Sequence, residues 1–298
     1  LNNAKKFSTV TQKHITFKRC SIQLKTENYY LGFFRIFAPK ITNNPTTQAF
    51  YAGRLELLNR NTKSDRGDVC LIQLPYHIKV QVTTTDLASV HLSKLESEEF
   101  IIKTDKGSVN VADLKAENIK VESSEGSLQT EGRLQASNIE LKTGHNSGIT
   151  CSNIMANNFL VSTHAGPISV KSCYSNKSHF TTLMGNIRLD HMHKSVMIDV
   201  IQQGNLHISS FSGNMQASLK SGEVFMQASE FTDKNKIFIH EKGKVELLIP
   251  DIVKNLPATN LIADKIKVDE KILKLGRFMD DSHPMRLNVK KVFLLSNL

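Results

Sequence analysis

The sequence predicts an all-β fold, specifically a β-solenoid of about eight stacked coils of 18–22 residues with β-strand caps at both ends. Two observations lead to this prediction. Glycines recur at near-constant intervals, and each is followed by a strand of alternating polarity. Three sets of apolar positions, which we call columns, recur through the repeats with the same period as these glycines. An antiparallel sandwich would also contain short strands and glycine turns, but it would not require the columns to stay in phase.

The glycines mark the corners of the predicted coils. They are Gly107, Gly126, Gly148, Gly166, Gly185, Gly204, Gly222 and Gly243. Runs such as GSVNV, GSLQT and GNLHI follow them, and their alternation places every second side chain on one face. We expect glycine at these corners because it accepts the positive φ of a tight turn.

The apolar columns predict which side chains share the interior. One column lies two residues after most of the glycines, and a second precedes the glycine. The third consists of Leu114, Leu134, Ile154, Cys173, Met192, Phe211 and Phe231. Because no coil can bury such side chains alone, stacking neighbouring coils gives one continuous core. Cys173 is therefore expected to be a small core residue rather than a nucleophile.

An Ala-x-Asn motif recurs at steps of twenty residues in AENIKVES, ASNIELKT and ANNFLVST. Its asparagines are Asn118, Asn138 and Asn158. Side-chain amides one coil apart can form a hydrogen-bonded ladder, which is our structural hypothesis for these residues. The alternative is that asparagine simply favours turns.

The chain divides into four predicted segments. Residues 1–46 are a basic targeting or disordered segment, 47–92 an N-terminal β cap, 93–249 the solenoid repeats, and 250–298 a C-terminal β cap and tail. Caps are expected because a solenoid exposes raw strand edges at its ends.

The formal net charge of +10 is concentrated at the start of the sequence. Residues 1–92 contain 13 Lys and Arg against 5 Asp and Glu, whereas 93–249 contain 16 against 17. Neutral repeats argue against a nucleic-acid partner, which needs a basic surface on the folded body. The first 26 residues contain six basic residues and no acid. That composition is typical of a mitochondrial transit peptide, with a disordered tail and a cytoplasmic location as the alternative.

No apolar run is long enough for a membrane span, and no nucleotide-binding or hydrolase signature occurs. The cysteines are Cys20, Cys70, Cys151 and Cys173. None forms a CxxC pair, so reduced, buried thiols are expected and neither a zinc ribbon nor another cofactor site is indicated.

The coils together with LPYHIKVQV before them and KGKVELLIP after them resemble the bacterial adhesin β-solenoid domain. They are also similar to its animal relatives, the "family with sequence similarity 185" proteins. The resemblance covers roughly residues 68–275. It implies a β-solenoid with no established enzymatic activity and, from the animal members, a mitochondrial location. It supplies no functional residues.

The sequence favours a simple binding role over catalysis or metal binding. A polysaccharide enzyme on a β-helix needs clustered carboxylates, but those of the coils are scattered. The one metal candidate is DHMHK, in which His191 and His193 share a strand side beside Asp190, with His207 or His179 as a further ligand. Met192 fits the apolar column, so both histidines are expected to face outward, and no metal is predicted.

The sequence thus favours a non-catalytic, adhesin-like binding or scaffold protein with a protein or glycan partner. A polymer-acting enzyme is the alternative. The predicted binding surface is a strip of outward residues that follow the apolar position of each coil: Asn110, Gln129, Ser169, Arg188 and His207.

Overall fold

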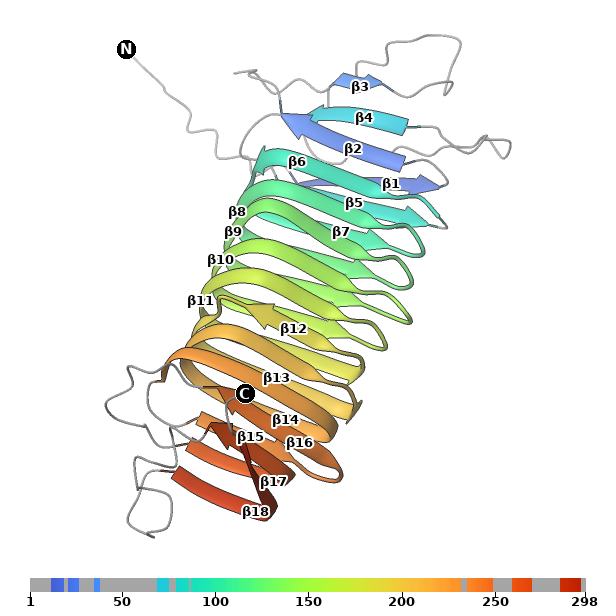
Figure 1. Ribbon diagram of the computed structural model, residues 1–298. Helices are drawn as coiled ribbons and strands as arrows, with labels where there is room; N and C mark the ends of the chain where they lie inside the picture. Colours follow the sequence, from blue (N-terminus) through green and yellow to red (C-terminus); the bar gives the residue numbers. More distant parts are fainter. Residues whose placement is uncertain are drawn as a thin grey trace, which may run out of the picture.

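The computed structural model describes residues 12–18, 21–26, 35–37, 69–74, 79–85, 87–231, 235–248, 259–269 and 285–295. These residues form a β-solenoid of about eight coils, which confirms the predicted fold class (Figure 1). The strands are β1 Gln12–Lys18, β2 Ser21–Thr26, β3 Arg35–Phe37, β4 Val69–Leu74, β5 Lys79–Thr85, β6 Val90–Glu96, β7 Glu99–Thr104, β8 Val109–Ser123, β9 Leu128–Thr143, β10 Ile149–Thr163, β11 Ile168–Met184, β12 Ile187–Asp190, β13 His193–Gln203, β14 Leu206–Phe231, β15 Asn235–Ile239, β16 Gly243–Leu248, β17 Thr259–Asp269 and β18 Met285–Leu295.

Each coil contributes one stretch of strand to each of two faces. Face A contains β6, the first halves of β8 to β11, then β12, the two ends of β14, and β16. Face B contains β5, β7, the second halves of β8 to β11, then β13, the middle of β14, and β15. All these pairings are parallel, so like positions of successive coils lie beside one another (Figure 1).

The core lies between the two faces, and its columns are those that the sequence predicts. Leu114 pairs with Leu134 and Leu134 with Ile154, and the isolated bridge between Cys173 and Met192 continues this column. All five side chains are buried. Since burial of one such side chain is worth about 1.5–3 kcal/mol, each coil depends on its neighbours for stability.

The glycine corners are explained mainly by close approach rather than by backbone conformation, which corrects the sequence-based expectation. Of the eight glycines in the column, only Gly185 and Gly222 have φ in the left-handed region, at 156° and 141°. At Gly126, by contrast, an added Cβ would lie 1.9 Å from the carbonyl oxygen of Gly107 in the preceding coil. The stacking of coils, more than the turn itself, therefore excludes a side chain.

Gly148 departs from this column. An added Cβ at Gly166 would contact the carbonyl of Ser147, so Ser147 holds the corner position in that coil. Ile149 consequently occupies the apolar position, in register with Leu128 and Ile168. The corner of this coil therefore lies one residue before Gly148. The interval of 22 residues between Gly126 and Gly148 in the sequence does not reveal this shift.

The coils continue beyond the predicted segment boundaries. β6 crosses residue 92, and β5 and β6 pair in parallel with β7 and β8 as the strands of later coils do, so β5 and β6 form a further coil. Ala88 takes the corner position there, which is why counting glycines missed this coil.

Parallel pairing also reaches the two ends. β17 pairs with β15 and β16, and β18 pairs with β17, so parallel pairing continues from the repeats into the predicted C-terminal cap. In the predicted N-terminal segment, β1 pairs with β5 in parallel and β2 with β4 and β6. Only β3 and β4 pair antiparallel among the described strands. The remainder of both segments lies outside the described residues.

Candidate functional site

Face A carries a continuous outward column of side chains parallel to the solenoid axis. Asn110 pairs with Gln129, Gln129 with Thr150, and Thr150 with Ser169. The register then continues through Arg188 to His207. The structure thus brings all five predicted strip residues into one line and adds Thr150 to them. We call this column, with Phe225 at its end, the face A strip.

At one end of the face A strip, two amides converge on one carboxylate. Glu131 accepts hydrogen bonds from Asn110 Nδ2 at 3.4 Å and from Gln129 Nε2 at 3.1 Å. The Oδ1 atom of Asn110 is buried and has no partner among the described residues. Because this oxygen is shielded from the surface, the groups that the strip offers to a ligand at this end are the outward amides and the Glu131 carboxylate.

One coil beyond Ser169 in the strip, Arg188 lies beside Asp190, with Nε 3.3 Å from Oδ2. Ser209 donates a 2.5 Å hydrogen bond to the other carboxylate oxygen. Partial burial alone would raise the pKa of Asp190, but these two hydrogen bonds and the Arg188 charge outweigh it and lower the pKa. Asp190 is thus an ionised carboxylate whose two oxygens already accept hydrogen bonds, and it is not a proton donor.

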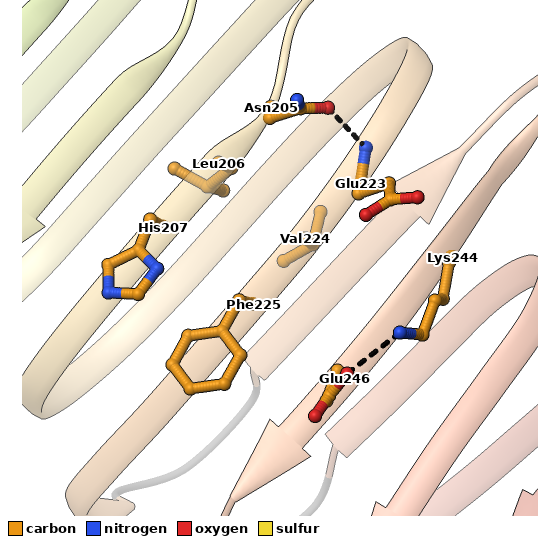
Figure 2. A pocket seen from close by; sticks show the side chains of 8 residues that line it. All are labelled: Asn205, Leu206, His207, Glu223, Val224, Phe225, Lys244 and Glu246. Atoms are coloured by element: carbon orange, nitrogen blue, oxygen red, sulfur yellow. Dashed lines mark hydrogen bonds and ion pairs between the residues drawn. The ribbon is translucent and has the colours of Figure 1, made fainter.

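A pocket of about 300 Å³ lies at the far end of the strip (Figure 2). The rings of His207 and Phe225 stack there, with centroids 4.7 Å apart and planes 11° from parallel. Figure 2 shows both rings projecting from neighbouring stretches of β14. The pocket is lined by Asn205, Leu206, His207, Glu223, Val224, Phe225, Lys244 and Glu246.

Face B carries the asparagine ladder. Asn138 Nδ2 donates to Asn118 Oδ1 at 2.9 Å, and Asn158 Nδ2 donates to Asn138 Oδ1 at 2.8 Å. These are the hydrogen bonds that the ladder hypothesis predicts. Asn138 and Asn158 are exposed, so the ladder lies on the surface of the solenoid. The ladder borders a shallow groove of about 380 Å³ that Ile101 and Leu160 also line.

The DHMHK residues that the sequence analysis considered as metal ligands do not form a site with other described residues. Met192 is buried, and His191 and His193 point away from the core on either side of it. His193 stacks on Tyr174, at a centroid distance of 4.3 Å, while His179 bonds to Asp199 on face B. Among the described residues, no three His, Cys, Asp or Glu side chains are placed to hold a metal ion.

The carboxylates of the coils are dispersed and mostly paired with cations of the same or the adjacent coil. On face B, Glu122 lies 3.3 Å from Lys120 and 3.4 Å from Lys103, and Lys120 lies 3.0 Å from Glu140. Partial burial alone would raise the pKa of Glu122, but the hydrogen bond and charge of Lys120 outweigh it and lower the pKa. A glycosidase acid needs the opposite shift.

Cys151 and Cys173 are free and fully buried. Burial raises the pKa of the Cys151 thiol to about 12, against a smaller lowering by its hydrogen bond with Thr130. Burial also raises the pKa of Cys173, against hydrogen bonds with Ser175 and Ser178. Such thiols remain protonated and unreactive at neutral pH, in accord with a core role. Cys20 and Cys70 have no described side chains.

Sequence reasoning missed two members of the face A strip. Phe225 follows the apolar residue Val224 just as Asn110 follows Val109, so the same count would have found it. Thr150 was hidden by the displaced corner at Gly148. The pocket itself carried no sequence signal, because Asn205, Glu223 and Lys244 come from three different coils.

Comparison with known proteins gives one match. A protein-family model described as Toastrack DUF4097 matches residues 40–145 and again residues 133–258. The two matches together span most of the coils and more than half of the chain. No curated protein and no solved structure matches significantly.

Proposed function

Because this chain belongs to the Toastrack DUF4097 family, a family of β-solenoid-like domains, we propose that it is a non-catalytic binding scaffold that presents face A to a partner. The observation that carries the proposal is the face A strip. Its side chains are held in register by the parallel ladders on which the fold depends. A surface supported in this way is rigid before a partner arrives, which lowers the entropic cost of binding.

The carboxylates support binding over catalysis. A polymer-acting enzyme requires two carboxyl groups facing one bond, one of them with a raised pKa. Glu122 and Asp190 instead have lowered pKa values and lie on different faces. We therefore assign no enzymatic activity in this proposal.

The proposal includes a mitochondrial location. It is supported by the basic, acid-free first 26 residues and by the resemblance to the animal "family with sequence similarity 185" proteins. Among the described residues, no helix is long and apolar enough to cross a membrane.

Proximity labelling in cells tests both parts, since it reports the compartment and the neighbours together. The informative variant is Ser169→Arg, which places a long charged side chain in the middle of the face A strip. Ser162→Arg is its matched control, because Ser162 is a half-buried outward serine on face B.

We expect Ser169→Arg to lose the strongest neighbours and Ser162→Arg to keep them, with all three proteins melting at the same temperature. The same neighbours in Ser169→Arg would show that face A is not the interface. A set of cytoplasmic neighbours would refute the mitochondrial location.

A further inference from the structure

The pocket at the end of the face A strip combines an aromatic ring with polar groups from three coils. Phe225 is half-buried and stacks on His207 through one face. In the next coil Glu246 is in register with Phe225, and both line the pocket. Figure 2 shows Phe225 between His207 and Glu246, so the side of the ring away from His207 lies toward Glu246.

Hydrogen-bond donors and acceptors line the pocket beside this ring. Asn205 Oδ1 accepts a bond of 2.9 Å from the backbone N–H of Glu223, which orients the side chain and its NH₂ donor group. Lys244 Nζ lies 2.8 Å from Glu246 Oε2. The hydrogen bond with Glu246 raises the pKa of Lys244, and the nearby charge of Glu223 adds to that shift.

This combination matches the surface of a pyranose sugar. A sugar ring has an apolar C–H face, which packs on an aromatic ring, and a rim of hydroxyl groups. Each hydroxyl both donates and accepts. Carboxylates such as Glu223 accept from hydroxyl groups, while the Asn205 amide and the Lys244 ammonium donate to them.

We infer that the pocket binds one sugar of a neutral glycan chain over Phe225, and that the chain continues along the face A strip past Arg188 and Ser169. Coils stack about 4.8 Å apart. Successive rings of an extended glycan repeat at a comparable length, so each sugar would meet the side chain of one coil. The inference deepens the proposed function and rests on it.

The charges favour a neutral ligand over the alternatives. Glu223 and Glu246 outnumber Lys244 in the pocket, which disfavours a phosphate backbone. Lys244 in turn disfavours a cationic ligand. At the centre of the strip, Thr150 and Ser169 offer hydroxyl groups instead of the Trp, Tyr or Arg side chains that dominate protein hot spots.

Binding of soluble cello-oligosaccharides and N-acetylated chito-oligosaccharides of increasing length, measured by calorimetry with the full chain, tests the inference. We expect at least one series to bind, and the affinity to rise with length because longer chains reach more coils. Phe225→Ala should weaken binding roughly tenfold or more, as expected for an aromatic anchor, while Phe225→Tyr should retain it.

Two further variants separate a loss of binding from a loss of folding. Glu223 is exposed, so Glu223→Gln should weaken binding without changing the melting temperature. Tyr174 is an exposed ring outside the face A strip that also stacks on a histidine, so Tyr174→Ala is the matched control and should bind as the wild type does.

The inference is wrong if neither series binds, or if Phe225→Ala and Glu223→Gln bind as tightly as the wild type. If the Ser169→Arg variant still loses its cellular neighbours in that case, the proposed binding role stands with a different partner. If both experiments fail, the proposed function fails with the inference.

Discussion

Gly126 shows how one atom limits the sequence of a stacked coil. Its added Cβ would lie 1.9 Å from the Gly107 carbonyl oxygen and 2.5 Å from the carbonyl carbon. Both contacts are to backbone, which cannot move away without breaking the ladder bonds on either side. Coils held about 4.8 Å apart therefore leave no room for a side chain that points along the axis.

We predict that Gly126→Ala lowers the free energy of unfolding by about 2 kcal/mol or more, at the upper end of ordinary substitutions, because the clash is with backbone. Chemical denaturation would measure this. Gly148→Ala is the matched control. Its Cβ would lie 3.1 Å from atoms of Pro167, so a smaller loss is expected. Equal losses in the two variants would contradict the explanation by close approach.

Glu122 links the charges of face B to the pH dependence of stability. Its folded pKa lies below the ordinary value of 4.5, so the unfolded chain takes up this proton at a higher pH than the folded chain does. The resulting stabilisation is present above pH 4.5 and is lost as the pH falls through the folded pKa. Solvent screening keeps the effect small, because Lys120 and Glu122 are both partly exposed.

We predict that the wild type loses slightly more stability than Glu122→Gln on acidification from neutral pH to below 4.5, with a difference under about 1 kcal/mol. Urea unfolding at a series of pH values would measure the difference. If the unfolding free energies of the two proteins fall equally as the pH decreases, Glu122 makes no contribution.

The asparagine ladder connects β8, β9 and β10 through side chains. Asn138 is its middle member, since it donates to Asn118 and accepts from Asn158. Asn158 takes part in only one of these bonds, because Lys177 replaces asparagine at the next position of the column. The ladder therefore spans three coils, and its members contribute unequally to the free energy of unfolding.

We predict that Asn138→Ala costs about 1 kcal/mol in unfolding free energy and Asn158→Ala about half of that, since exposed hydrogen bonds lie at the lower end of the usual range. Guanidinium denaturation of the two variants beside the wild type gives the comparison. Asn176→Ala is a useful reference, because it removes two hydrogen bonds outside the ladder, one donated to Asn157 and one accepted from Lys194. A cost at Asn158 that equals the cost at Asn138 would argue against the ladder.

The assembled solenoid behaves as a linear stack in which each coil packs against the coils before and after it. β9, for example, pairs with β8 on one side and with β10 on the other along both faces. Stability is then a sum over coils and their interfaces rather than the property of one centre. A complete coil is removable in principle, whereas part of a coil is not.

We predict that deletion of residues 128–148 gives a shorter, folded solenoid with a lower melting temperature. Ile149 would take the position of Leu128, with which it is in register, so every later column stays aligned. Deletion of 128–138 removes only part of the coil and shifts the later columns, so this variant should not fold cooperatively. Circular dichroism melts distinguish the outcomes, and a failure of both variants to fold would refute the additive stack.

The sequence predicted the stacked coils and the line of strip residues because both follow from period alone. The prediction failed at corner positions where a residue other than glycine is present. Ala88 replaces glycine at a corner, and Ser147 replaces it at another, so the first coil and the position of Thr150 were missed. The reason given for the glycines was also mostly wrong, because clashes between coils are not visible in a single repeat.

By itself, the sequence determined the fold class, the buried columns and which residues share a face, since alternation and repeat length are properties of the chain. Only the tertiary structure decided where side chains from different coils meet. The stacking of Phe225 on His207 and the pocket beside Lys244 depend on the alignment of successive coils. Those contacts join residues roughly one coil apart, and no local pattern encodes the distance between their side chains.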